Sequence, residues 1–195
     1  MRKEITIPYE EYADEQALSA VDAALLEQAR RCVDNAYAPY SEFKVGAAVR
    51  LTDGTVVCGS NQENVAFPSG LCAERVAVFA AGANYPGVPI AALAVTARAA
   101  DGHPVDWPIS PCGACRQSLI EYEQRYGHKI RVILQGSTGK VVVFDGIDRL
   151  LPFQFEAEGI GADAPHSQVG ADVSVGSDQH VGSDGTVGSE GKKRN

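Results

Sequence analysis

The sequence predicts an α/β protein in which helices pack on a layered β-sheet. Five short apolar runs have the length and the β-branched content of strands, and three longer segments show apolar residues at helical spacing. Helices and strands alternate in the second half of the chain, as in layered α/β folds. Apolar residues make up 45% of the 195 residues, which suits one domain with a buried core.

The first half predicts one helix and a hairpin. Residues 14–37 form an amphipathic pattern that begins with acidic residues and is ended by Pro39. Its apolar positions are Leu18, Val21, Leu25, Ala29 and Cys32. Residues 43–51 and 55–60 are strand-like and are joined by Thr-Asp-Gly, which is a strong hairpin signal.

The second half predicts two helices and three strands. The Ala-rich segment 71–84 has apolar residues three and four apart and predicts a buried helix, and 111–126 predicts another. The apolar run 90–98 is typical of an inner strand. Two further strands are expected at 130–135 and 140–144.

The composition changes after Phe155. The last 40 residues contain seven acidic and three basic residues but no aromatic residue and no Leu, and Val-Gly-Ser-Asp or Val-Gly-Ser-Glu recurs every six residues. Such a segment buries too little apolar area to offset its chain entropy. We therefore expect a catalytic domain over 1–158 and a disordered, acidic tail rich in Gly, Ser and Asp over 159–195.

The charge and the N-terminal sequence limit the partners and the location. The net charge is −8 and the pI is about 5.0, which argues against a nucleic-acid partner because such a partner needs a basic surface. No stretch approaches the roughly 18 apolar residues of a membrane-spanning helix. The charged N-terminus lacks the apolar run of a signal peptide, so a cytoplasmic location is expected. The five cysteines are then expected to be thiols or metal ligands rather than disulfides, with Cys32 and Cys58 as core thiols.

Three other cysteines predict a catalytic metal site. Cys112 and Cys115, in Ser-Pro-Cys-Gly-Ala-Cys-Arg-Gln, are three apart and share one face of a helix. Cys72, in Gly-Leu-Cys-Ala-Glu-Arg, begins a different helix. Three ligands from two helix N-termini can fill three corners of a tetrahedron and leave the fourth open, as in catalytic zinc sites. This spacing matches the three-cysteine signature of zinc-dependent deaminases.

Two charged residues follow Cys72 and have expected roles. Glu74 is close to the metal without being obliged to bind it, so we expect it to transfer protons as a general acid and base. Three thiolates on Zn²⁺ leave a net negative charge, which weakens its Lewis acidity. We therefore expect a cation to compensate, with Arg75 the first candidate and Arg116 the second.

Other interpretations of the cysteines explain less of the sequence. A Cys-x-x-Cys pair alone is more often a redox pair or a structural zinc site. A redox pair accounts for neither Cys72 nor Glu74. A structural four-cysteine site would need Cys58 as its fourth ligand, and Cys58 lies in a strand pattern.

The chain resembles the homotetrameric cytidine deaminase family. The resembling segments are Tyr-Ser-Glu-Phe-Lys-Val-Gly-Ala-Ala-Val (40–49), the run from Gly59 through Asn-Gln-Glu-Asn to Cys-Ala-Glu-Arg-Val-Ala-Val (59–78), the second cysteine motif (110–117) and Leu-Leu-Pro-Phe-Gln-Phe (150–155). They occur in the family's order over residues 18 to 155.

The resemblance implies a fold, a reaction and site residues. The fold is three-layer α/β/α with a mixed five-stranded sheet. The reaction is zinc-dependent hydrolysis of cytidine and 2′-deoxycytidine to uridine and 2′-deoxyuridine plus ammonia, within pyrimidine salvage. One zinc ion per chain is held by Cys72, Cys112 and Cys115, with Glu74 as the acid and base. The substrate contacts are Asn61 and Glu63, on the ribose, and Phe43, lining the nucleoside pocket. The alternative for Phe43 is an aromatic residue of a strand that packs in the core.

The resemblance also implies an assembly. In a homotetramer each site is completed by neighbouring chains, and Phe153 or Phe155 is the aromatic that reaches across. One departure is Phe67, which stands where the family often has Tyr. It removes a hydroxyl group and leaves the chemistry untouched.

Three alternative functions remain. One is a small-molecule deaminase of the blasticidin-S type, which shares both cysteine motifs. Asn-Gln-Glu-Asn and Phe-Lys-Val-Gly-Ala-Ala favour a cytidine deaminase over it. The second is a non-catalytic, zinc-stabilised interaction module, against which the intact Glu74 argues. The third, deamination within a polynucleotide, lacks a basic, aromatic surface for the strand.

Overall fold

The structure, a computed structural model, describes residues 1–99 and 101–155, so the predicted acidic tail lies outside the described residues. The strands are β1 (Glu10–Tyr12), β2 (Phe43–Leu51), β3 (Val56–Ser60), β4 (Ile90–Ala99), β5 (Arg131–Leu134) and β6 (Val141–Asp145). The α-helices are α1 (Ala20–Val33), α2 (Ala73–Asn84) and α3 (Gly113–Tyr126). Three 3₁₀ turns lie at Glu15–Ala17, Phe67–Ser69 and Ile147–Arg149.

The strands form one mixed sheet in the order β1-β6-β5-β4-β2-β3. The β4–β5 pair is parallel, with α3 as its crossover, and the other pairs are antiparallel. Within the described part of the chain the sheet therefore has six strands rather than the expected five. The added strand is β1, a short Glu-Glu-Tyr segment without the apolar alternation that marks a half-buried strand.

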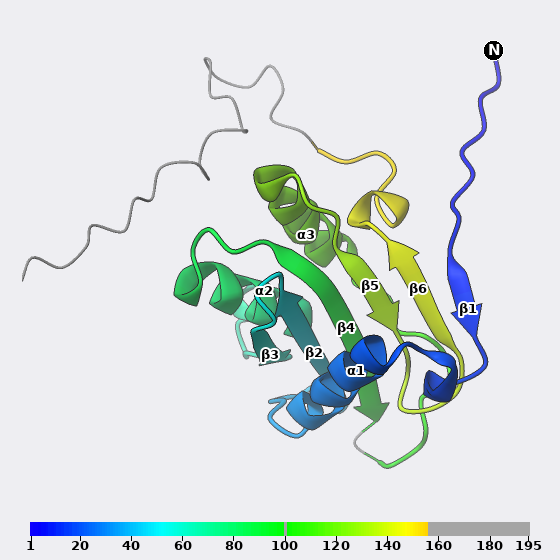
Figure 1. Cartoon of the computed structure of the whole chain (residues 1–195). Helices are drawn as coiled ribbons and strands as arrows, with labels where there is room; N and C mark the ends of the chain where they lie inside the picture. The colour runs from blue at the N-terminus through cyan, green and yellow to red at the C-terminus, as the bar shows by residue number, and fades with distance from the viewer. Residues whose placement is uncertain (100, 156–195) are drawn as a thin grey trace, which may run out of the picture.

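Two cores lie on opposite faces of the sheet, which confirms the three-layer α/β fold (Figure 1). Ala47 and Val49 of β2 share a core with α2 and α3, whereas Ala48 between them faces α1. This alternation follows from the two-residue period of a strand.

The first helix is shorter than predicted. A 3₁₀ turn over Glu15–Ala17 precedes it, and α1 begins after Ser19, whose hydroxyl accepts a hydrogen bond from the backbone N–H of Asp22. This N-cap satisfies an N–H group that the helix itself leaves without a partner. Val21, expected on the apolar face, is 51% exposed, while Leu25, Ala29 and Cys32 are buried.

Charged residues anchor β1 at the sheet edge. Arg131 of β5 contacts Glu10 of β1 at 3.1 Å, Asp22 of α1 at 3.1 Å and Asp145 of β6 at 2.7 Å. Lys140 contacts Glu11 at 2.6 Å.

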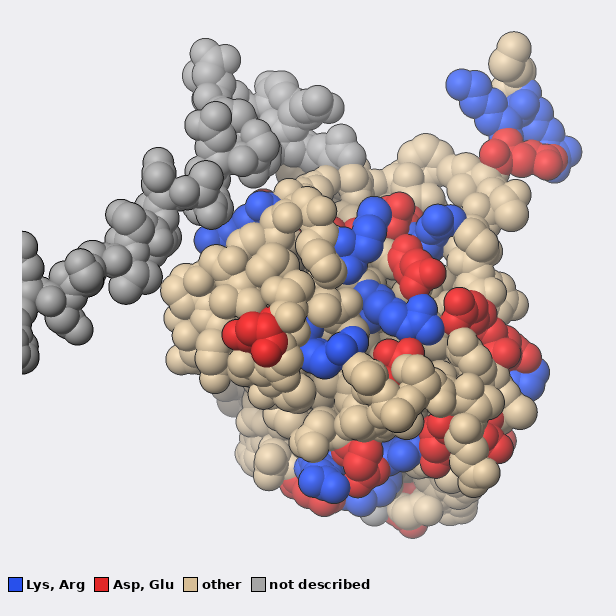
Figure 2. Space-filling model, viewed as in Figure 1, with Lys and Arg blue, Asp and Glu red and all other residues tan. Residues whose placement is uncertain are grey.

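On the face shown in Figure 2, basic and acidic residues are interleaved rather than separated. Among the described residues, no helix is both long and apolar enough to cross a bilayer.

Cys32 and Cys58 correct a prediction. They were expected to be separate core thiols, but they form a disulfide that joins α1 to β3, with Cα atoms 6.0 Å apart. Cys32 is buried and Cys58 is exposed on the edge strand. The packing of α1 on the β2–β3 hairpin places them together although they are 26 residues apart in the sequence.

Candidate active site and metal centre

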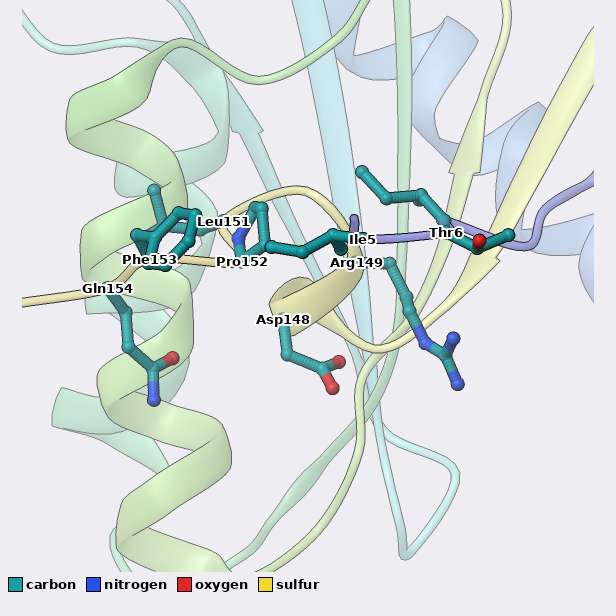
Figure 3. Close-up of a pocket in the computed structure, with 9 residues that line it drawn as sticks. Ile5, Thr6, Asp148, Arg149, Leu151, Pro152, Phe153 and Gln154 are labelled. Carbon is teal, nitrogen blue, oxygen red and sulfur yellow. The ribbon is translucent and has the colours of Figure 1, made fainter. Parts of the chain in front are cut away.

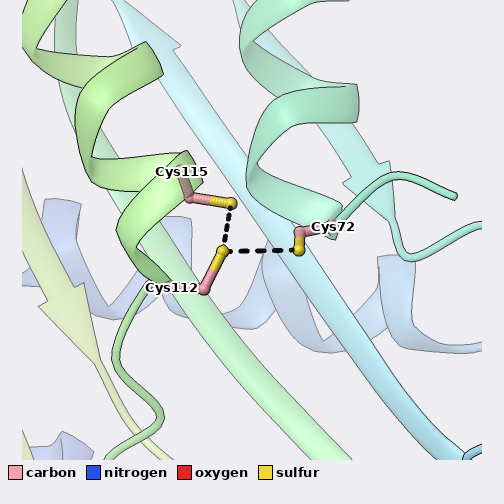
Figure 4. A group of neighbouring side chains, drawn as sticks. All are labelled: Cys72, Cys112 and Cys115. Atoms are coloured by element: carbon pink, nitrogen blue, oxygen red, sulfur yellow. Dashed lines mark hydrogen bonds between the residues drawn. The ribbon is translucent and has the colours of Figure 1, made fainter. Parts of the chain in front are cut away.

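The N-termini of α2 and α3 bring three cysteines together (Figure 4). Cys72 is the N-cap of α2, Cys112 is the N-cap of α3, and Cys115 lies in the first turn of α3. The Sγ atom of Cys112 is 3.7 Å from that of Cys72 and 3.5 Å from that of Cys115. All three sulfur atoms lie within 4.8 Å of one another, so the predicted ligands form one cluster.

The cluster has the dimensions of a zinc site. Zn–S bonds of about 2.3 Å in a tetrahedron place two sulfur atoms about 3.8 Å apart. The observed separations of 3.7 and 3.5 Å are close to this value. Neither N-cap cysteine makes a side-chain capping hydrogen bond, so both sulfur atoms are available to a metal ion. The donor set therefore fits Zn²⁺ with a fourth position left for a non-protein ligand.

Cys72 and Cys115 differ in how easily they ionise. Hydrogen bonding from Cys115, with a further contribution from Arg75, lowers the pKa of Cys72 to about 5. The same hydrogen bond, together with burial, raises the pKa of Cys115 well above its ordinary value. Since metal ligands must be thiolates, the cluster releases protons when it binds a metal ion.

The two candidate cations have different surroundings. The Nη2 atom of Arg75 lies 3.9 Å from the Sγ atom of Cys72. Arg116 instead donates to the carbonyl oxygens of Pro111 and Leu150 and to the hydroxyl of Ser110, each at 2.8 Å. The contacts described for Arg116 therefore tie the start of α3 to the segment after β6, and Arg75 is the cation beside the sulfur atoms.

Glu74 lies in the first turn of α2 and is only 4% exposed. Burial raises the pKa of its carboxyl group above the ordinary value, and the nearby Cys72 thiolate adds to the shift. A buried carboxyl group with a raised pKa can both hold and release a proton near neutral pH.

A cavity of about 540 Å³ adjoins the cluster. Cys72 and Arg75 line it, and so do the predicted ribose contacts Asn61 and Glu63. The Asn61 side chain accepts from the N–H of Val45 at 2.8 Å and donates to the carbonyl of Phe43 at 2.9 Å. The cavity therefore joins a polar segment after β3 to the start of α2.

Phe43, the third predicted substrate contact, lies two residues after this cavity's Ser41 in the sequence but does not line the cavity. Its side chain is half-buried. Its backbone carbonyl orients Asn61 instead. The aromatic residues that do line the cavity are Tyr40 and Phe67, whose rings pack edge to face with centroids 5.7 Å apart.

Sequence reasoning did not single out Tyr40 or Ser41, which also line the cavity. Both lie in the motif Tyr-Ser-Glu-Phe, directly before Phe43. The signal that could have indicated them is their position in a polar turn between Pro39 and the strand that begins at Phe43.

A sequence model of the cytidine and deoxycytidylate deaminase zinc-binding region matches residues 19–126. The matched residues are more than half of the chain and include the three clustered cysteines and Glu74. The chain belongs to this family. It is therefore a zinc-binding deaminase, and the predicted family and cofactor are confirmed.

Individual deaminases agree with this assignment. A cytidine deaminase of Halalkalibacterium halodurans is 38% identical over 136 residues, which cover 69% of this chain and 93% of that protein. One from Sporosarcina psychrophila is 43% identical over 99 residues, 50% of this chain and 67% of that protein.

Solved structures of cytidine deaminases share the fold. The one from Burkholderia pseudomallei has a TM-score of 0.58 at 43% identity and covers 68% of this chain and 97% of its own. The one from Mycobacterium tuberculosis has a TM-score of 0.53 at 32% identity and covers 68% and 95%.

Proposed function

We propose that this deaminase hydrolyses cytidine and 2′-deoxycytidine to uridine and 2′-deoxyuridine, with release of ammonia. The observation that carries the proposal is the position of a buried carboxyl group, Glu74, two residues from a thiol that lines a nucleoside-sized cavity. The relatives are named as cytidine deaminases, which supports cytidine as the nucleoside substrate.

The proposed metal ligands are Cys72, Cys112 and Cys115. Zinc in such a site supplies Lewis acidity, which makes water nucleophilic near neutral pH. Glu74 is the proposed general base and acid: its carboxylate removes a proton from the attacking water and delivers one to the ring nitrogen beside the amino-bearing carbon. It then helps to protonate the departing amino group, so that water and cytidine become uridine and ammonia. Arg75 offsets the negative charge of the three thiolates.

Asn61 and Glu63 are the proposed sugar contacts. Asn61 keeps one amide hydrogen and one lone pair beyond its two bonds to β2, so it can still bind a hydroxyl group. Phe43 remains a proposed pocket residue, and Phe43→Ala tests it: a contact with the nucleoside predicts a raised KM with an unchanged kcat.

The proposal extends to assembly and location. We propose a homotetramer in which Phe153 or Phe155 reaches a neighbouring site, since these side chains are 83% and 70% exposed. Figure 3 shows Phe153 among the residues that line a groove, which Asp148, Arg149 and residues 151–154 form with residues 5–7. We also propose a cytoplasmic location and a role in pyrimidine salvage, and both rest on the resemblance alone. Sedimentation of the purified chain with and without Phe155→Ala tests the assembly.

The experiment that tests the reaction measures ammonia release from cytidine by the wild type and by Glu74→Gln, with the zinc content of both. A proton-transfer role predicts that the variant keeps one zinc ion per chain and loses about 10²- to 10⁴-fold in kcat. Glu121→Gln, at an exposed position of α3, is the matched control and is expected to keep full activity.

Two results contradict the proposal in different ways. If both proteins hold zinc and neither releases ammonia from cytidine, the substrate is wrong and blasticidin S is assayed next. If the wild type binds zinc and turns over neither cytidine nor blasticidin S, the zinc site is structural.

A further inference from the structure

Glu63 is bound by the turn that precedes β2. Its Oε2 atom accepts hydrogen bonds from the backbone N–H groups of Tyr40, at 2.9 Å, and Ser41, at 3.3 Å. Its Oε1 atom accepts a third from the hydroxyl group of Ser41. A carboxylate offers about four acceptor positions, so one position on Oε1 remains for a ligand.

The hydroxyl group of Ser41 both donates and accepts a hydrogen bond. While its hydrogen is donated to Glu63, its oxygen accepts from the backbone N–H of Phe43 at 3.1 Å. The next residue, Glu42, has a φ of 54°, which non-glycine residues rarely adopt. Such conformations persist only where surrounding contacts hold them, and they cluster at ligand sites.

The segment that carries Glu63 is held in place without Ser41. Tyr37 bonds it through the backbone, donating to the carbonyl of Asn61 at 3.0 Å and accepting from the N–H of Glu63 at 2.9 Å. Gln62 pairs with Leu71 through two backbone bonds of 2.9 Å. The hydroxyl of Ser41 is therefore not needed to place the backbone, and what it adds is the rotation of the Glu63 carboxylate.

We propose that Ser41 is a positioning residue for nucleoside binding, whose hydroxyl group turns the Glu63 carboxylate so that its remaining acceptor position receives one sugar hydroxyl. This inference rests on the proposed function. The hydroxyl of Ser41, followed by the N–H of Tyr40, also holds the pKa of Glu63 below its ordinary value, so the acceptor is ionised at neutral pH.

The test measures KM and kcat of the zinc-loaded wild type, Ser41→Ala and Ser41→Thr with cytidine. Ser41→Ala is expected to raise KM about fivefold to tenfold with kcat unchanged, as for a weakened hydrogen bond to a charged group. Ser41→Thr keeps the hydroxyl group and is expected to restore most of the affinity. An unchanged KM in Ser41→Ala overturns the proposal.

A matched serine separates positioning from folding. Ser137 accepts from the N–H of Val105 at 2.7 Å and donates to its carbonyl at 3.2 Å, and it does not line the cavity at Cys72. Ser137→Ala is expected to lower thermal stability and leave KM unchanged. If Ser41→Ala behaves in the same way, its role is structural and the proposal fails.

A double-mutant cycle tests whether Ser41 acts through Glu63. In a Glu63→Gln background, Ser41→Ala is expected to change KM less than twofold, because the group that it positions is already altered. Additive effects overturn the proposal.

Analogues identify the hydroxyl group that Glu63 accepts. The effect of Ser41→Ala is expected to disappear with 2′-deoxycytidine or with 2′,3′-dideoxycytidine, depending on which hydroxyl is bound. An effect of the same size with cytidine, with both of these analogues and with 5′-deoxycytidine overturns the proposal. Loss of all turnover in the wild type would instead refute the proposed function.

Discussion

The guanidinium group of Arg75 lies 3.9 Å from the sulfur atom of Cys72, across the first turn of α2. Cys72 is also the N-cap of α2, and the partial positive charge of a helix N-terminus favours a thiolate there. Both effects act on the cysteine whose pKa is lowered to about 5. Arg75 therefore adds to the hydrogen bond from Cys115 in favouring the Cys72 thiolate.

Arg75→Gln is expected to weaken zinc retention in mild acid. Protons compete with zinc for the thiolates, and loss of the cation raises the pKa of Cys72, so half-release of zinc moves to higher pH. The measurement is zinc retained after dialysis against a chelator between pH 5 and 8. Arg125→Gln, at an exposed position of α3, is the control. An unchanged pH of half-release would show that Arg75 does not compensate the thiolates.

Zinc removal is expected to lower the thermal midpoint by about 10 °C, because a ligand at 100 to 1,000 times its Kd stabilises by about 3 to 4 kcal/mol. The physical cause is that a zinc ion bound by the three cysteines joins the N-termini of α2 and α3. Scanning calorimetry with and without chelator measures the change. In Cys112→Ser the chelator should have much less effect, and an equal shift in that variant would mean that the ion binds elsewhere.

The Cys32–Cys58 disulfide predicts that only three thiols react in the zinc-free, denatured protein without reductant. Mass spectrometry after alkylation counts them. A crosslink over 26 residues stabilises by about 3.5 kcal/mol through the unfolded chain. Cys58→Ser should therefore unfold at a lower temperature than the oxidised wild type, and reductant should abolish the difference. Five reactive thiols would contradict the pairing.

Glu10 predicts an acid-dependent attachment of β1. A hydrogen bond from Tyr12, followed by one from Arg131, lowers its pKa below the ordinary 4.5. A lowered pKa means that the contribution to stability is present above pH 4.5 and is lost as the pH falls through the folded-state value. Glu10→Gln is expected to melt about 1 to 2 °C below the wild type at pH 7.

The two midpoints should converge as the pH falls through the folded-state pKa of Glu10. Glu4→Gln, which changes an exposed pair with Arg2, should show no such pH dependence. A difference that stays the same size across the whole acid range would mean that Glu10 acts other than by its charge.

Much of the fold follows from local patterns. The predicted helix over 111–126 and the observed Gly113–Tyr126 differ by two residues, because Cys112 caps the helix instead of entering it. The strand β1 was missed because Glu10 and Glu11 carry no apolar signal. Ion pairs to residues more than 100 positions away hold it instead.

The sequence by itself determined the layered fold and singled out the three cysteines that the structure clusters, together with Glu74 two residues after Cys72, because the spacing of residues within a helix or strand is local geometry. Only the tertiary structure decided that Cys32 faces Cys58, that Arg75 rather than Arg116 lies beside the sulfur atoms, and that Ser41 bonds Glu63. These contacts join separate elements. Which side chains meet across them depends on strand order and on the angles at which loops leave the sheet, and neither is encoded in the spacing of any one segment.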